Sequence, residues 1–110
     1  MLDETLAKLE TNIRQSEAIQ AEKKAELLQL LTTLKSELAA LAQTHVEQVE
    51  SVVGFTERSM QEALRPTRDP QLVASATQDL SASVAELEVS HPQLVQIVNA
   101  ISVLLSNMGI

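Results

Sequence analysis

The side chains that could hold a metal ion in this 110-residue chain are two histidines and fifteen acidic residues, because cysteine is absent. His45 has Glu47 and Glu50 close by in the sequence. A di-iron carboxylate bundle requires Glu-x-x-His and a zincin requires His-Glu-x-x-His. Residue 42 is alanine and residue 46 is valine, so His45 fits neither pattern. We therefore expect no metal ion and no cofactor.

The second histidine, His91, directly precedes Pro92, where helix capping or a chain reversal accounts for it. Acid–base catalysis would need a partner group and a pocket, and the sequence names neither. The chain lacks a glycine-rich phosphate loop and a nucleophile elbow, and its carboxylates lie at helical spacings such as Glu4–Lys8. We expect that the protein is not an enzyme.

A leucine stripe dominates the middle of the chain and indicates a helix. Its members alternate steps of four and three residues: Leu27, Leu31, Leu34, Leu38 and Leu41, then His45, Gln48, Val52 and Phe55. This spacing is the seam of a helix packed on other helices, and it predicts one long helix over 21–64. Such a helix would be about 65 Å long, too long for the shorter helices to cover unless they lie end to end.

A second copy of the chain is therefore expected to cover part of this seam. The predicted oligomer interface consists of Leu31, Leu34, Leu38, Leu41, His45 and Val52. A histidine in such a seam would tune association between pH 5 and 8.

Three shorter helices are predicted around the long one, near 2–15, 70–88 and 92–108, with a loop at 65–69. Polar seam positions favour a break near 16–21, although one continuous helix remains an alternative. Asp69 is expected to cap a helix that begins at Pro70. Gly54 is read as a close helix contact or slight kink, with a hinge as the less favoured alternative. Gly109 and Ile110 are expected to fold back onto the last turn. The prediction is a single all-α domain over 1–110, a helical bundle with coiled-coil-like oligomeric packing.

The charge distribution narrows the classes of partner. The net charge is −7, all basic residues lie at or before Arg68, and Phe55 is the only aromatic residue. Nucleic-acid binding needs a basic face and, for single strands, stacking aromatics, so we expect no nucleic-acid partner. The N-terminus lacks the pattern of a signal peptide, and the most apolar stretch, 94–110, is too short and interrupted to span a bilayer. Cytoplasmic location is the expectation.

The C-terminal quarter resembles a family of short bacterial helical domains of unknown function. The resemblance rests on the run from Glu86 to Leu94, which includes Glu88, His91 and Pro92, and on the ending from Asn107 to Ile110. It extends to the leucine-rich opening helix, Met1 to Arg14, and implies a bacterial, helical, cytoplasmic protein without assigning an activity. The region between Ala42 and Pro70 is longer than in typical members.

Packing and capping features account for nearly every specific residue in the sequence. The leading hypothesis is therefore a structural or protein-interaction module that self-associates, with the identity of any protein partner open. The alternative is a small helical bundle that binds an apolar ligand or lipid, because leucine, valine and methionine faces can line an apolar cavity.

Overall fold

The computed structural model describes residues 2–17, 19–65 and 67–107, and these form helices without any strand. The helices are α1 (Leu2–Gln15), α2 (Ala21–Leu41), α3 (Val46–Ala63), α4 (Pro70–Val84), the short 3-10 helix η1 (Ala85–Leu87) and α5 (Pro92–Asn107). The all-α prediction is confirmed for this part of the chain. The predicted fold-back of Gly109 and Ile110 lies outside the described residues.

The predicted long helix over 21–64 is wrong, because the structure divides it into α2 and α3. The α2 helix ends at Leu41, whose carbonyl oxygen accepts hydrogen bonds from the backbone N–H groups of Thr44 (3.1 Å) and His45 (2.8 Å). His45 then leaves the helical conformation, with φ −133° and ψ 60°, immediately before α3 begins. The chain thus reverses direction within four residues.

Burial of apolar surface explains why the chain reverses without a glycine or proline. A continuous helix would leave its leucine stripe open to water, and each such side chain contributes about 1.5–3 kcal/mol when fully buried. Reversal lets Val49, Val52 and Met60 of α3 join the same core as the α2 leucines. Thr44 and His45 are also weak helix formers, so a break at this position costs little.

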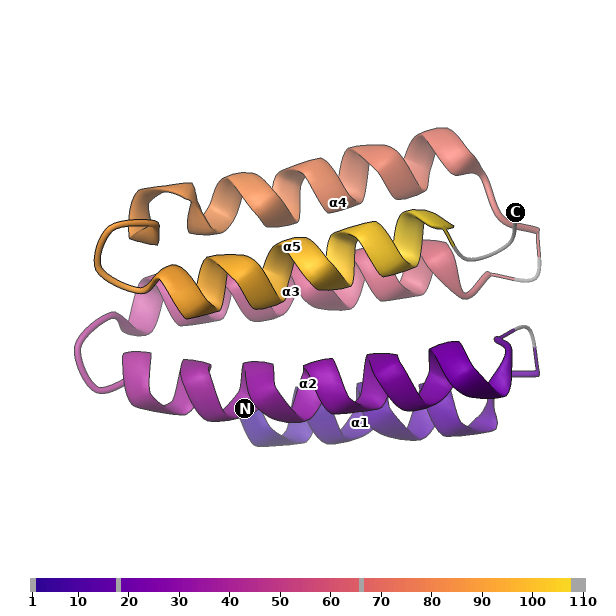
Figure 1. The fold of residues 1–110 in the computed structure, drawn as a ribbon, viewed down its shortest axis with the longest axis horizontal. Coiled ribbons are helices and arrows are strands. Elements are labelled where there is room, and N and C mark those ends of the chain that lie inside the picture. The colour runs from indigo at the N-terminus through magenta and orange to yellow at the C-terminus, as the bar shows by residue number, and fades with distance from the viewer. Residues whose placement is uncertain (1, 18, 66, 108–110) are drawn as a thin grey trace.

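The helices pack side by side in a ring whose order is α1, α2, α5, α4 and α3 (Figure 1). The α3 helix also contacts α5 and α2 across the ring, so it touches the four other α-helices. The connections at 42–45 and 88–91 lie at one end of the molecule, whereas the connections 16–20 and 64–69 lie at the opposite end (Figure 1). We call these the histidine end and the linker end.

The core is formed almost entirely by aliphatic side chains. Its largest fully buried members are Leu6, Ile13, Leu27, Leu31, Leu34, Leu38, Leu41, Met60, Leu80, Leu94, Ile101 and Leu105. In α4 the buried apolar residues are Val73, Ala76, Leu80 and Val84, whereas Leu72 is 41% exposed. Gly54 also differs from its main interpretation, because a Cβ atom added there would meet nothing within 4 Å. The residue is not a close helix contact.

Hydrogen bonds from side chains stabilise several helix ends. The Asp69 carboxylate accepts a hydrogen bond from the backbone N–H of Gln71 (2.9 Å), which caps α4 as its sequence predicts. At the linker end, the Lys24 ammonium donates to the carbonyl oxygen of Arg14 (3.1 Å), the last turn of α1. The positive charge of Lys24 also complements the negative, C-terminal end of the α1 helix dipole.

No helix within the described ranges combines the length and the apolar character that crossing a membrane requires.

Candidate functional site

The residues predicted as an oligomer interface lie inside the single chain. Leu31, Leu34, Leu38, Leu41 and Val52 are at most 1% exposed, and all five belong to the hydrophobic core. A second copy was invoked because a 65 Å seam would otherwise remain uncovered. Since α3 folds back along α2, the chain covers these side chains itself, and the reason for placing an interface there is gone.

His45, the sixth predicted interface residue, has different surroundings. It is partly exposed at the histidine end and immediately precedes α3. Its ring centre lies 5.9 Å from that of His91, and the two ring planes cross at 76°. The fold therefore brings together the only two histidines of the chain. Sequence spacing gave no sign of this pair, because the two residues come from separate chain reversals.

Hydroxyl groups orient both imidazoles. The Nδ1 atom of His45 lies 2.7 Å from the Thr44 hydroxyl oxygen, and the Nδ1 atom of His91 lies 3.0 Å from that of Ser90. Within the described ranges no group of three or more His, Asp or Glu side chains is arranged to hold a metal ion. Two imidazoles are consequently the nitrogen ligands that this end of the bundle can offer.

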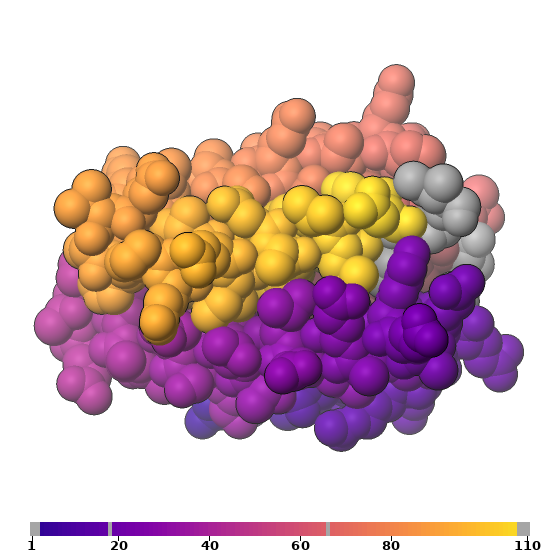
Figure 2. Space-filling view, in the orientation of Figure 1, coloured from indigo at the N-terminus to yellow at the C-terminus, as the bar shows by residue number. Residues whose placement is uncertain are grey.

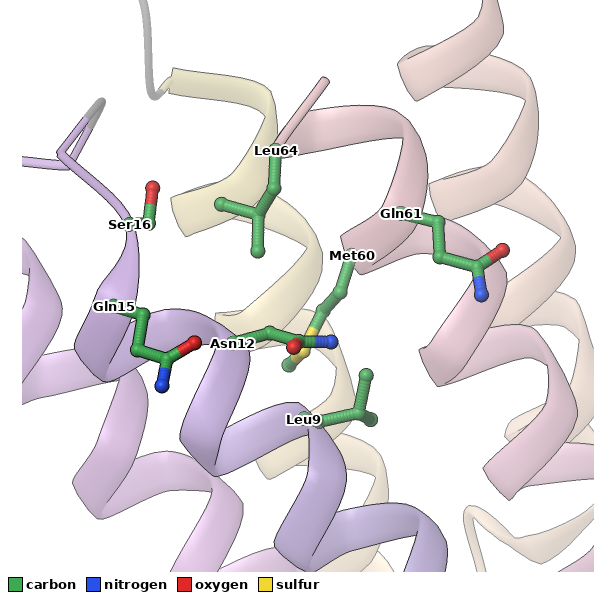
Figure 3. Close-up of a pocket in the computed structure, with 7 residues that line it drawn as sticks. All are labelled: Leu9, Asn12, Gln15, Ser16, Met60, Gln61 and Leu64. Carbon is green, nitrogen blue, oxygen red and sulfur yellow. The ribbon is translucent and has the colours of Figure 1, made fainter. Parts of the chain in front are cut away.

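A depression of about 290 Å³ lies between α1 and the end of α3. It is lined by Leu9, Asn12, Gln15, Ser16, Met60, Gln61 and Leu64, none of which is charged. Figure 3 shows the Met60 side chain extending toward α1 between Leu9 and Asn12, with the amides of Gln15 and Gln61 on either side. This depression combines an apolar floor with polar amide edges, so it is not the purely apolar cavity that a lipid would require.

The exposed side of α5 is a surface without charged side chains. In the space-filling view α5 occupies the middle of one face, flanked by α4 and α2 (Figure 2). None of the sixteen residues of α5 is charged. Its exposed positions are Pro92, Gln93, Gln96, Asn99, Ala100, Val103, Ser106 and Asn107. We call these residues the neutral face.

Val103 forms a ridge on the neutral face between two grooves. Its side chain is 60% exposed. A groove of about 680 Å³ separates α5 from α2 and is lined on the α2 side by Lys23 and Glu26. A second groove of about 360 Å³ separates α5 from α4 and is lined by Thr77, Gln78 and Ser81, among others. Val103 lines both grooves.

Hydrogen bonds between α4 and α5 fix the floor of the second groove. The Ser81 hydroxyl donates to the Asn99 side-chain oxygen (3.2 Å) and lies 3.3 Å from the Ser102 hydroxyl. The Ser102 hydroxyl also donates to the carbonyl oxygen of Thr77 (3.5 Å). Because these groups are paired with one another, the groove is held in shape without a ligand.

Residues 27–110 match the family model of a domain of unknown function, DUF4404. The chain belongs to the DUF4404 family. The DUF4404 match includes most of α2 and all of α3, α4 and α5, with the His91–Pro92 pair, the histidine end and the neutral face. The α1 helix lies outside it. No curated protein and no solved structure shows significant similarity to the chain. Membership of the DUF4404 family therefore brings no activity or site residue with it.

Proposed function

We propose that this DUF4404 protein is a protein-interaction module that self-associates through the neutral face of α5. One observation carries the proposal: α5 has no charged residue along its whole length, in a chain with a net charge of −7. Two copies of such an acidic protein repel one another, and the repulsion is smallest where charges are absent. Depletion of charged residues is also the compositional mark of the centre of a protein–protein interface.

Shape supports the same surface. Ridges of one helix pack into grooves of another, and the neutral face presents the Val103 ridge beside two grooves. Two copies related by a two-fold axis could each place this ridge in a groove of the other, as an isologous interface requires. A stable interface buries about 800 Å² per partner, so the edges of α2 and α4 would contribute with α5.

A matched pair of variants tests the proposal. Val103→Glu places a charge on the ridge, whereas Val89→Glu makes the same change at a side chain that is 96% exposed and outside α5. We expect wild type and Val89→Glu to show concentration-dependent dimers in analytical ultracentrifugation and Val103→Glu to sediment as a monomer. Circular dichroism should show equal helix content for all three. A wild-type chain that remains monomeric at high micromolar concentration contradicts the proposal.

Salt provides an independent check. An interface held by ion pairs weakens as salt rises, but an interface centred on the uncharged α5 helix of two acidic proteins should strengthen, because salt screens their mutual repulsion. We expect the dimer to become tighter between about 0.05 and 0.5 M sodium chloride. Weaker association at high salt would indicate that charged surfaces outside α5 make the contact.

Apolar-ligand binding is the second candidate, and its best support is the depression between α1 and α3. Native mass spectrometry of protein purified from its source separates the two functions. Bare dimers support self-association, whereas a reproducible small-molecule adduct on a monomer favours ligand binding.

A further inference from the structure

We propose that His45 and His91 together form a binding site for one divalent transition-metal ion of the zinc type. The two rings belong to different chain reversals, 42–45 and 88–91, which meet at the histidine end (Figure 1). Neutral imidazole is a preferred ligand of zinc, nickel and copper ions. His91 directly precedes Pro92, but neither histidine belongs to the neutral face, and the proposal does not require self-association.

The separation of the rings suits a shared ion. Zinc lies about 2.0–2.1 Å from each imidazole nitrogen, so at a tetrahedral angle the centres of two rings on one ion are about 5 Å apart. The observed separation of 5.9 Å exceeds this by about 1 Å, which small rotations of the two side chains can close. A single ion can hold two imidazoles whose planes cross at 76°, because each nitrogen lone pair lies in the plane of its own ring.

The hydroxyl partners leave the correct nitrogen available. The Thr44 hydroxyl donates to the carbonyl oxygen of Leu41 (3.5 Å), so its oxygen can accept from the Nδ1–H of His45 (2.7 Å). This arrangement favours the tautomer in which Nε2 carries the free lone pair. The Ser90 hydroxyl oxygen lies 3.0 Å from the Nδ1 atom of His91, where it can likewise accept from Nδ1–H. Metal-bound histidines generally use their second nitrogen in such a hydrogen bond, which orients the ring.

The charge of this end of the bundle favours a cation. Glu47 and Glu86 line one depression at this end, formed by the start of α3 and the end of the α4–η1 segment. The sequence has no lysine or arginine between Lys35 and Arg58 and none after Arg68. The basic residues Lys35 and Arg58, which flank the first of these stretches, are engaged with carboxylates elsewhere. Lys35 lies 3.9 Å from Asp3, and Arg58 lies 3.3 Å from Asp79.

Two protein ligands leave the remaining positions of the ion to water. The site is therefore open, unlike a structural zinc site with four protein ligands. An ion held by both rings would link the α2–α3 reversal to the reversal before α5, and binding to the folded state alone would raise its stability.

The composition of the chain makes the test selective. Because it contains only two histidines and no cysteine, an NMR spectrum of the untagged, full-length protein shows two imidazole signals. We expect both to shift together during titration with zinc chloride, with an end point of one ion per chain and a rise in the thermal midpoint. His45→Gln or His91→Gln should abolish the joint end point, and Thr44→Val should weaken affinity about tenfold or more. Glu4→Gln is the control, because it replaces an exposed carboxylate on α1 outside the histidine pair, and it should leave affinity unchanged.

Three results would overturn the site. The first is independent titration of the two imidazoles toward two ions per chain. The second is a shift of only one imidazole. The third is unchanged zinc affinity in the double variant His45→Gln/His91→Gln, which would place the ion on carboxylates or the amino terminus.

Discussion

The Arg68 guanidinium donates a hydrogen bond to the carbonyl oxygen of Leu105 (2.7 Å), thirty-seven residues further along the chain. A second hydrogen bond from the same nitrogen reaches the carbonyl oxygen of Ser106 (3.1 Å). The Lys23 ammonium donates to the carbonyl oxygen of Asn107 (3.4 Å). The last turn of α5 contains no basic residue of its own. Its free carbonyl groups are thus satisfied by cations from the α3–α4 linker and from α2, as helix ends require.

Replacing Arg68 should destabilise the fold measurably. Arg68→Met keeps an apolar stem but leaves the carbonyl groups of Leu105 and Ser106 without this partner, and we expect a loss of about 1–2 kcal/mol because hydrogen bonds to charged groups are strong. Arg14→Met is the control, since Arg14 is 65% exposed and lies 4.0 Å from Glu10. Surface pairs of this kind contribute about 0–1 kcal/mol. Urea unfolding followed by circular dichroism measures both. Equal midpoints for the two variants would show that the Arg68 cap does not matter.

Gly54→Ala should stabilise the protein. Gly54 lies within α3, is exposed, and has no neighbour that an added methyl group would strike. Glycine in a helix costs roughly 0.5–1 kcal/mol relative to alanine. A gain of this size should raise the thermal midpoint by about 2–6 °C in a chain of this length. A lower midpoint, or weaker self-association in ultracentrifugation, would reveal an unseen neighbour at Gly54.

Leu38→Ala distinguishes a core residue from an interface residue. Leu38 is fully buried within one chain, and removing such a side chain typically costs about 2–5 kcal/mol. We expect a large fall in the urea midpoint that does not depend on protein concentration. Leu72→Ala makes the same change at a side chain that is 41% exposed and should cost far less. A stable Leu38→Ala monomer, obtained from a wild-type oligomer, would restore the interface predicted from the leucine stripe.

Asp69→Ala should lose the cap of α4. The Asp69 carboxylate accepts from the N–H of Gln71 at 2.9 Å, and replacing such a cap by alanine costs about 1 kcal/mol. Asp69→Asn should retain most of the stability, because its side-chain oxygen can accept the same hydrogen bond. If the alanine and asparagine variants unfold at the same midpoint, the side-chain hydrogen bond contributes nothing.

Local signals in the sequence led to several correct features. The alternation of leucines placed Leu31, Leu34 and Leu38 on one buried face, because helical periodicity is a property of neighbouring residues. Asp69 and Pro70 marked the start of α4 for the same reason: capping and proline geometry act within a few residues.

The reversal between Leu41 and Val46 could not be read in this way. Thr44 and His45 are only weak helix breakers, and four intervening residues kept the leucine stripe in phase with Val52, so the pattern looked continuous. The chain reverses because the reversal buries apolar surface in the tertiary structure, and a local sequence pattern carries no information about such burial. The approach of His45 to His91 follows from the same reversal, so the local sequence pattern could not predict it either.

The two ends of the bundle also differ in electrical character. Glu37, Glu47, Glu50, Glu86 and Glu88 belong to the segments that approach the histidine end, where few basic residues lie. At the linker end the basic residues Arg14, Lys23, Lys24, Arg65 and Arg68 are offset by acidic residues that include Glu17, Glu22, Glu62 and Asp69. Negative charge is therefore concentrated at the histidine end. If two copies meet through α5, an antiparallel alignment sets the acidic end of one beside the more nearly neutral end of the other, whereas a parallel alignment opposes two acidic ends. The distribution of charge away from α5 would thus select the antiparallel dimer, even though α5 itself carries no charge.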